Sequence, residues 1–343
     1  MQTEGQSIYL VGDCMQNFKL KIFTPIFALL LFSFCLQAQG QSQDQAKGFA
    51  LGRMYFSAPG AAWFVMDDLS MDGKLGGTVN LTVDHAHNPL VVRSADGTHS
   101  LAVVSEEQVA DFGLAATYSR YRIYLNLTGP TYLRGNSDAI DGESFAGPRV
   151  DLGAQPDTVS DMRFGLDARV IGERESPFRL GVGAQIFVPS GNQSDYVSDG
   201  TYRAMLRLLV AGDSGNFAYS GQTGVHFRKT QDVTPGSPKG SEFLFGLAGG
   251  ERFKLASSVS IVIGPEIYGA SAFRSFLRPA ATDFEWLLTT RIVQKQIGNR
   301  QWMVRLGAGS GFAPQFGAPE WRAVLGVELS GTSDQHDSSP GLN

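Results

Sequence analysis

The most regularly spaced charged side chains in this chain alternate with apolar residues. In RLGVGAQIFV, which begins at Arg179, arginine, glycine and glutamine alternate with leucine, valine, alanine and isoleucine. The same pattern recurs in DMRFGLDARV from Asp161 and in EWRAVLGVEL from Glu320. Successive side chains of a β-strand point to opposite faces, so each segment predicts a strand with one apolar and one charged face. Rings of charged side chains are what an aqueous pore uses to select solutes.

The charged face of these strands is predicted to line the interior of a closed barrel whose apolar face meets lipid. An arginine at the middle of the lipid face costs roughly 2 to 4 kcal/mol, so the opposite assignment is not tolerable. The side chains predicted to line the lumen are Arg122, Arg163, Asp167, Arg169, Arg179, Arg203, Arg207, Asp283, Glu285, Arg291, Arg305, Arg322 and Glu328. This lumen has two interpretations: a wet pore for small polar solutes, or an interior closed by arginine–carboxylate pairs.

Three short motifs carry residue types that serve catalysis or metal binding elsewhere. GDSG at Gly212 has the sequence of a serine-protease nucleophile segment, but Gly, Asp and Ser are also the expected residues of a tight turn. His85 and His87 have the spacing to bind a metal from one strand face, with no convincing third ligand. Asp195 and Asp199 lack the spacing of a known calcium loop. We therefore predict no catalytic residue, no metal, no cofactor and no enzyme activity.

The elements that position these side chains are short strands joined by connections of alternating length. From about residue 158 onward, short turns are predicted after Val170, at GDSGN, near Gly250 and near Gly298, with long connections between them. Tight periplasmic turns and longer outer loops are typical of a transmembrane barrel. An immunoglobulin-like sandwich has no reason to alternate in this way. The predicted fold is an all-β, antiparallel transmembrane β-barrel.

The strand count depends on two long apolar runs. If Gly76–Ser94 and His99–Ser119 are each one strand joined at ADGT, the barrel has about 12 strands; if each run breaks, it has about 14. Both counts are even, as single-chain bacterial barrels require. Pro89 weakens the long-strand interpretation, because proline belongs at edges or bulges. We prefer 12.

Domain boundaries follow from the N-terminal composition. Residues 1–38 are predicted to be a signal peptide whose true start lies near Met15, because two lysines precede an apolar run and then small residues. Residues 39–74 are predicted to be a periplasmic N-terminal segment or a plug, 75–330 the barrel, and 331–343 a disordered tail. Both cysteines, Cys14 and Cys35, fall in the part predicted to be removed.

Composition excludes several classes of protein. The formal net charge is −5, with 41 glycines among 343 residues and a mean hydropathy of −0.08. These values exclude a helical membrane bundle but not a barrel, because barrel strands hide their apolar half in alternation. No basic stripe points to nucleic acid. The expected partners are outer-membrane lipid and lipopolysaccharide, the barrel-assembly machinery, and small polar solutes.

An ordered set of segments resembles a known family. GFALGRMYFSAPGAAWFVMDDLS, VDHAHNPLVVRSADG, FGLAATYSRYRIYLNL, DMRFGLDARV, LGVGAQIFVPSG, the GPE at Gly264 and LGAGSGFAPQFGAPEWRAVLGV are together similar to the N-terminal barrel of OmpA-family outer-membrane proteins of myxobacteria and related deltaproteobacteria. The resemblance covers about residues 48–330 and implies an outer-membrane, channel-like barrel. The peptidoglycan-binding domain usual in that family has no counterpart after Leu329. The expected function is a porin-like channel; the alternative is a structural or surface-interaction barrel with a closed lumen.

Overall fold

The computed structural model describes residues 48–71, 73–152, 158–229, 240–278, 281–297, 300–312 and 317–333. All of them belong to one compact unit, residues 46–343. The predicted signal peptide, most of the predicted tail and the turn at Gly298 lie outside the described residues. Among the described residues, no helix has the length and hydropathy needed to cross a membrane.

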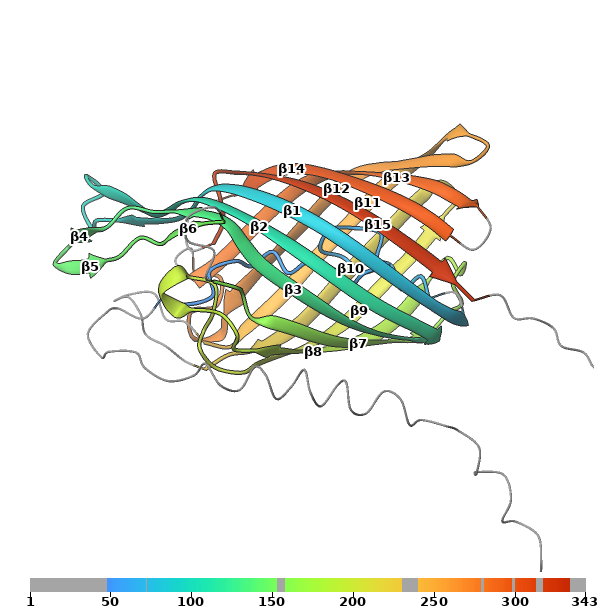
Figure 1. Cartoon of the computed structure of the whole chain (residues 1–343), viewed down its shortest axis with the longest axis horizontal. Coiled ribbons are helices and arrows are strands. Elements are labelled where there is room, and N and C mark those ends of the chain that lie inside the picture. Colours follow the sequence, from blue (N-terminus) through green and yellow to red (C-terminus); the bar gives the residue numbers. More distant parts are fainter. Residues whose placement is uncertain are drawn as a thin grey trace, which may run out of the picture. The chain divides into compact units, whose positions relative to one another are not determined.

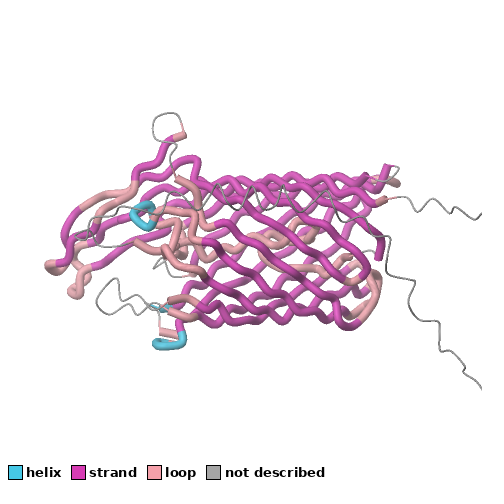
Figure 2. Tube along the Cα trace, turned by 60° about the horizontal axis from the view of Figure 1, so that its bottom comes forward, coloured by secondary structure: helices cyan, strands magenta, loops and turns pink. Residues whose placement is uncertain are grey.

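Twelve long antiparallel strands form a closed barrel (Figures 1 and 2). Each pairs with the next along the chain, and the first closes on the last from Gly76 opposite Thr332 to His87 opposite Trp321. The strands are β1 (Gly73–Arg93), β2 (Ser100–Ser119), β3 (Tyr121–Arg134), β7 (Met162–Ile171), β8 (Arg179–Val188), β9 (Arg203–Ser214), β10 (Phe217–Phe227), β11 (Glu242–Ala256), β12 (Val259–Ala272), β13 (Thr282–Ile297), β14 (Arg300–Gly311) and β15 (Trp321–Thr332). The preferred count of 12 is confirmed.

Smaller elements lie at one end of the barrel, on the left in Figure 1. They are the hairpin β4 (Asp138–Ile140) and β5 (Glu143–Phe145), the strand β6 (Arg149–Asp151), and the 3-10 turns η1 (Gln193–Asp195) and η2 (Phe273–Ser275). β6 pairs with the last residues of β3, and η1 lies in the connection between β8 and β9. These elements all lie in long connections.

Each of the two N-terminal apolar runs is one long strand, as the 12-strand count requires. Pro89 lies where the register between β1 and β2 shifts, between His87 and Leu90. Asn88 has φ of 53° there. A bulge tolerates proline because one residue of the bulged strand is left unpaired and needs no N–H for the ladder. The strand therefore passes through Pro89 without breaking.

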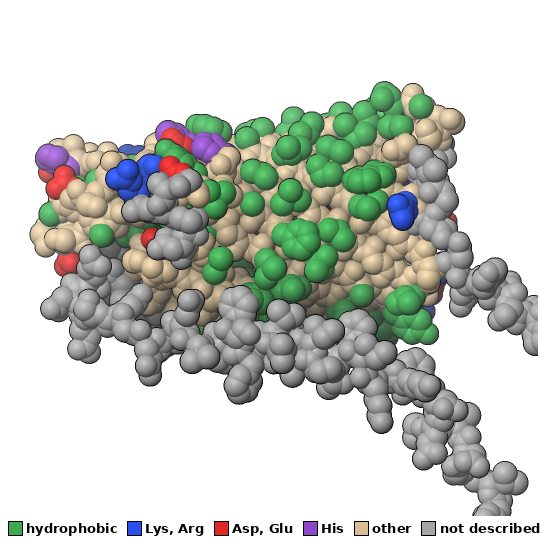
Figure 3. Space-filling model, in the orientation of Figure 1, with side chains coloured by type: hydrophobic (Ala, Val, Ile, Leu, Met, Phe, Trp, Pro, Cys, Tyr) green, Lys and Arg blue, Asp and Glu red, His purple; other side chains and the backbone are tan. Residues whose placement is uncertain are grey.

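Alternate side chains of each strand point into and out of the barrel. On β9, Met205 and Arg207 are buried inside, whereas Leu206 and Leu208 are 54% and 47% exposed on the outside. Figure 3 shows apolar side chains distributed over the visible outer wall, with charged ones concentrated near one end. Since a closed barrel pairs all of its backbone within the wall, it is one of the two structures that can cross a bilayer. The apolar outer band is therefore the lipid-facing surface of a transmembrane barrel.

The connections alternate in length, with one correction. Single residues or short turns join the strands at Arg120, at 172–178 and at 215–216, while 189–202 is long. The short turn expected near Gly250 lies instead at 257–258, because β11 continues to Ala256. At Gly250 a Cβ would lie 2.6 Å from the Ile263 carbonyl oxygen of β12 and 3.0 Å from the Trp63 ring inside the barrel, so the strand needs glycine there for close approach. A glycine in a strand can thus mark close approach rather than a turn.

Loop length predicts which end faces outward, and thiol labelling tests it. Asp141 lies in the β4–β5 hairpin of a long connection, and Glu175 lies in the short turn between β7 and β8; both are exposed. Asp141→Cys is expected to react with a membrane-impermeant maleimide on intact cells. Glu175→Cys is expected to react only after the outer membrane is permeabilised. The reverse pattern would show that the barrel is inserted with its long loops toward the periplasm.

Candidate functional site

Residues 48–71 lie inside the barrel and form no strand (Figures 1 and 2). We call this segment the plug. Its large side chains are almost fully buried: Trp63 and Phe64 are 1% exposed and Met66 is 0%. Barrels of about eight strands are filled by their own side chains, and barrels of about 16 leave an aqueous channel. A 12-stranded barrel lies between these sizes and holds one irregular segment of chain.

The plug begins at the end of the barrel that carries the long connections. Ala50 N–H donates to Asp199 Oδ1 at 2.9 Å, and Leu51 N–H donates to the Tyr196 carbonyl at 2.9 Å. Arg228 binds Asp199 and donates to the Ala50 carbonyl at 3.2 Å. Burial opposes ionisation of Asp199, but Arg228 and Arg203 overcome it and hold the pKa of Asp199 well below its ordinary value. This loop carboxylate is therefore charged when it binds the plug.

Two wall side chains hold the middle of the plug by its backbone. Glu266 accepts hydrogen bonds from the amides of Phe64 at 2.9 Å, Val65 at 2.9 Å and Met66 at 3.4 Å. Arg305 donates to the carbonyls of Ala61 at 3.2 Å and Trp63 at 2.7 Å. These bonds supply partners that an irregular backbone needs when it is buried.

A buried ion cluster links the plug to the barrel wall. Arg122 of β3 binds Asp67 of the plug and Asp167 of β7, the latter at 2.9 Å. Arg207 of β9 reaches Asp167 at 2.9 Å and the Tyr124 hydroxyl at 3.0 Å. The two arginines therefore neutralise two carboxylates across three strands. Buried charges are tolerated when they are paired in this way.

The plug ends at the short-turn end of the barrel. Arg169 donates to the carbonyls of Leu69 at 2.9 Å and Met71 at 2.7 Å. Arg179 donates to the Asp68 carbonyl at 3.0 Å and pairs with Asp213 at 2.9 Å. The chain then enters β1 at Gly73. The plug thus runs the length of the lumen.

All of the predicted lumen residues are buried on the inner face. Those that bind the plug directly are Arg122, Arg169, Arg179, Arg305 and Glu328. Those paired with other wall or loop residues are Asp167, Arg203, Arg207, Glu285 and Arg322. The three without a hydrogen bond or ion pair in the described part of the chain are Arg163, Asp283 and Arg291. The alternation of apolar and charged residues predicted which face of the wall each side chain occupies, but it did not predict which groups each side chain binds.

Sequence reasoning missed several of the residues that hold the plug. Glu266, Glu242 and Asp199 all anchor it, the second through an ion pair with Arg53 at 2.9 Å. In VSIVIGPEIYG, Glu266 is the only charged residue, so its strand carries no charged alternation to notice. An isolated carboxylate in an otherwise apolar strand is the available signal, because such a group must have buried donors nearby.

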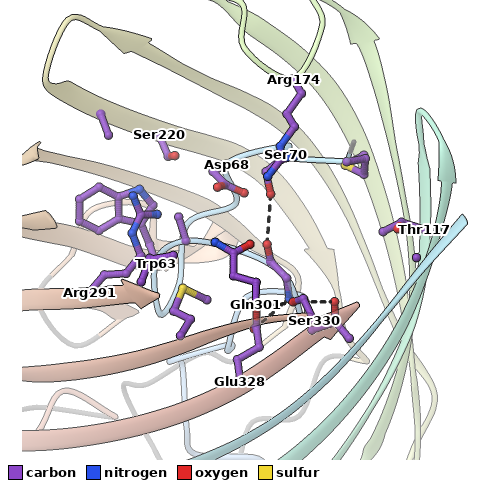
Figure 4. Close-up of a pocket in the computed structure, with 18 of the residues that line it drawn as sticks. Trp63, Asp68, Ser70, Thr117, Arg174, Ser220, Arg291, Gln301, Glu328 and Ser330 are labelled. Carbon is purple, nitrogen blue, oxygen red and sulfur yellow. Dashed lines mark hydrogen bonds between the residues drawn. The ribbon is translucent and has the colours of Figure 1, made fainter. Parts of the chain in front are cut away.

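The plug separates two cavities. The larger, about 600 Å³, lies at the short-turn end and is lined mainly by polar side chains including Asp68, Arg179 and Arg291 (Figure 4). The smaller, about 100 Å³, lies nearer the long loops between plug residues 50–56 and the wall, and includes Arg163. Trp63 borders the larger cavity and Phe56 borders the smaller one. The plug therefore lies between a mainly polar cavity and a smaller one whose wall is mainly apolar but includes charged side chains such as Arg163.

The short motifs have structural explanations. Within GDSG, Asp213 pairs with Arg179 and Arg252 beside a turn. His85 and His87 face outward and share the Glu106 carboxylate at 3.1 and 2.6 Å, whereas Asp84 faces inward to Arg322. Over the ranges that the structure describes, no three histidine, cysteine or acidic side chains are grouped to hold a metal ion.

Comparisons with known proteins give structural neighbours only. No family model and no curated protein matches the chain. An outer-membrane channel from Pseudomonas putida F1 is 12% identical, with a TM-score of 0.49 over 76% of this chain and 96% of that one. The CymD monoaromatic hydrocarbon channel is 9% identical, with a TM-score of 0.43 over 78% and 91%. The NanC porin is 5% identical, with a TM-score of 0.42 over 74% and 100%.

The architecture itself decides the location. Closed antiparallel barrels with an apolar exterior, a polar interior and alternating loop lengths belong to the outer membrane. This protein is an outer-membrane β-barrel. Its resemblance to OmpA-family barrels rests on the sequence segments alone.

Proposed function

We propose that the protein is an outer-membrane channel for small polar solutes, closed in this state by the plug. The observation that carries this proposal is the pair of cavities, about 600 Å³ and mainly polar and about 100 Å³ with both apolar and charged side chains, on the two sides of residues 57–66. A barrel that served only as a rigid wall would gain from filling this space with side chains, because interiors pack densely. Cavities on both sides of the plug are instead what remains of a path along the lumen.

The plug can leave without dismantling the barrel. The barrel wall is a complete ladder from β1 to β15, and no described residue of 48–71 takes part in it. The plug is held by hydrogen bonds to side chains such as Glu266, Arg305 and Arg169. Each such bond contributes about 0.5 to 1.5 kcal/mol net, or about 1.5 to 3 kcal/mol where a charged group takes part. Water that enters the lumen can replace them one by one.

A structural barrel with a permanently closed lumen is the second candidate. It is favoured by the Asp67–Arg122–Asp167–Arg207 cluster, which ties the plug to three strands through fully buried charges. Removing Arg122 would leave the Asp67 carboxylate without its ion pair, and such an uncompensated charge costs about 3 to 5 kcal/mol. If the barrel in the membrane cannot tolerate this unfavourable free energy, the plug stays bound and the lumen stays closed.

Loosening the plug at its centre distinguishes the two candidates. Glu266→Ala removes the acceptor of three plug amides, so the plug is expected to detach more often. In planar bilayers we expect the full chain to be closed with rare openings, and Glu266→Ala to open at least about tenfold more often, as the loss of a charge-assisted bond implies. Glu251→Ala removes an exposed carboxylate from neighbouring β11 and is the matched control. A folded Glu266→Ala barrel that opens no more often than this control would favour the structural candidate.

A further inference from the structure

The larger cavity contains a buried arginine that differs from its neighbours. Arg179 and Arg252 both pair with Asp213, at 2.9 and 2.5 Å. Arg291 of β13 is only 8% exposed and has no hydrogen bond or ion pair within the described residues. The ring of Trp63 lies 5.7 Å from its guanidinium carbon (Figure 4). Asp68 and Asp213 act on it electrostatically from the same cavity, but neither is hydrogen-bonded to it. A buried cation without a hydrogen-bonded anion is costly, so an anion that reached it would bind favourably.

Two further polar atoms of the same cavity also lack partners. Ser220 Oγ and Asp68 Oδ1 are buried, and neither makes a hydrogen bond within the described part of the chain. Both residues line the cavity with Arg291, and Figure 4 labels all three around it. Glu328, across the cavity, is already occupied by the Gly60 amide at 2.9 Å and by Ser330. These three residues therefore offer a solute one guanidinium, one carboxylate oxygen and one hydroxyl.

We propose that this cavity is a binding site for a small hydroxylated organic carboxylate. The planar guanidinium of Arg291 matches a carboxylate in a two-point hydrogen-bonded geometry. The Asp68 carboxylate accepts hydrogen bonds from the hydroxyls of the solute, and Ser220 either donates or accepts. The volume, about 600 Å³, is within the range of small-molecule sites. The inference rests on the proposed channel function for the solute's route, but not for binding, which the plugged protein can show at equilibrium.

Calorimetric titration of the refolded full chain in detergent tests the site. Gluconate is the probe, and glucose is the matched neutral compound with similar hydroxyls. Gluconate is expected to bind with a 1:1 stoichiometry and glucose at least about tenfold more weakly, since the charge-assisted bond is lost. Arg291→Gln is expected to weaken gluconate binding by at least about tenfold for the same reason. Arg300→Gln makes the same charge change at an exposed residue of β14 outside the cavity and is expected to leave the affinity unchanged.

Three results would overturn the assignment while the barrel remains folded by heat-modifiable migration on gels. They are no gluconate binding to the full chain, equal affinity for gluconate and glucose, or an unchanged affinity in Arg291→Gln. Because the titration needs no open lumen, its failure leaves the conductance test of the channel unaffected. Likewise, a silent channel with gluconate bound at Arg291 would reject transport and keep the site.

Discussion

Leu208→Arg is expected to prevent most of the barrel from folding into lipid vesicles. Leu208 lies near the middle of β9, pairs with Val182 and Thr223, and is 47% exposed on the outer face. An arginine on the lipid face near the bilayer midplane costs about 2 to 4 kcal/mol, which is a large part of the stability of an ordinary domain. The measurement is the folded fraction after refolding into vesicles, read as heat-modifiable migration on gels.

The adjacent change is expected to have the opposite outcome. Arg207→Leu removes a charge from the lumen, and Asp167 keeps its ion pair with Arg122 at 2.9 Å. This variant is expected to insert normally, because no charge meets lipid. It loses the bonds of Arg207 to Asp167, Tyr124 and Gln222, each contributing about 1.5 to 3 kcal/mol, and this loss is offset in part because a guanidinium is no longer buried. If Leu208→Arg folded as well as the parent while Arg207→Leu failed, the inner and outer faces of the barrel would have been assigned backwards.

The wall of the barrel was predictable from sequence because each strand's pattern depends only on residues close together in the chain. Lipid on one side and water or protein on the other impose a period of two, so the direction of Arg207 follows from its neighbours Leu206 and Leu208. The preferred count of 12 strands is correct although Pro89 argues against a long strand, because β1 accommodates Pro89 at a bulge. The local pattern failed at Gly250, where the glycine accommodates the close approach of the Ile263 backbone and the Trp63 ring rather than a turn. These neighbours lie 13 positions later and 187 positions earlier in the chain, so no local pattern reports them.

The sequence did not decide whether a plug is present, because the contacts that hold it join residues far apart in the chain. The sequence of residues 39–74 is compatible with either a periplasmic segment or a plug, because 48–71 have no strand or helix period of their own. Their partners are single residues on distant strands, such as Glu266 and Arg305. The alternation of side chains along each strand places these residues inside the barrel but does not predict what they bind. Arg122 and Arg207 both reach Asp167, whereas Arg291 reaches no carboxylate among the described residues.

Deleting residues 48–71 is expected to open the lumen permanently. The ladder between β1 and β15 and the lipid-facing surface do not include the deleted residues, so the barrel is expected to insert and remain heat-modifiable. The wall charges that the plug now satisfies, among them Glu266 and Arg305, would face water in a wide lumen. Hydration removes most of the cost of leaving them unpaired, because that cost arises from a dry environment. The deletion therefore exchanges a closed interior for a hydrated, charge-lined path.

Single-channel recording of the full chain and of this deletion variant tests the central claim most directly. Both proteins would be refolded under the same conditions, shown to be folded by gel migration, and recorded in planar bilayers at equal protein-to-lipid ratio. We predict that the full chain is closed apart from rare openings and that the deletion variant conducts steadily. A full chain that conducts as steadily as the deletion variant, or a folded deletion variant that passes no current, would contradict the account that residues 48–71 are what closes this barrel.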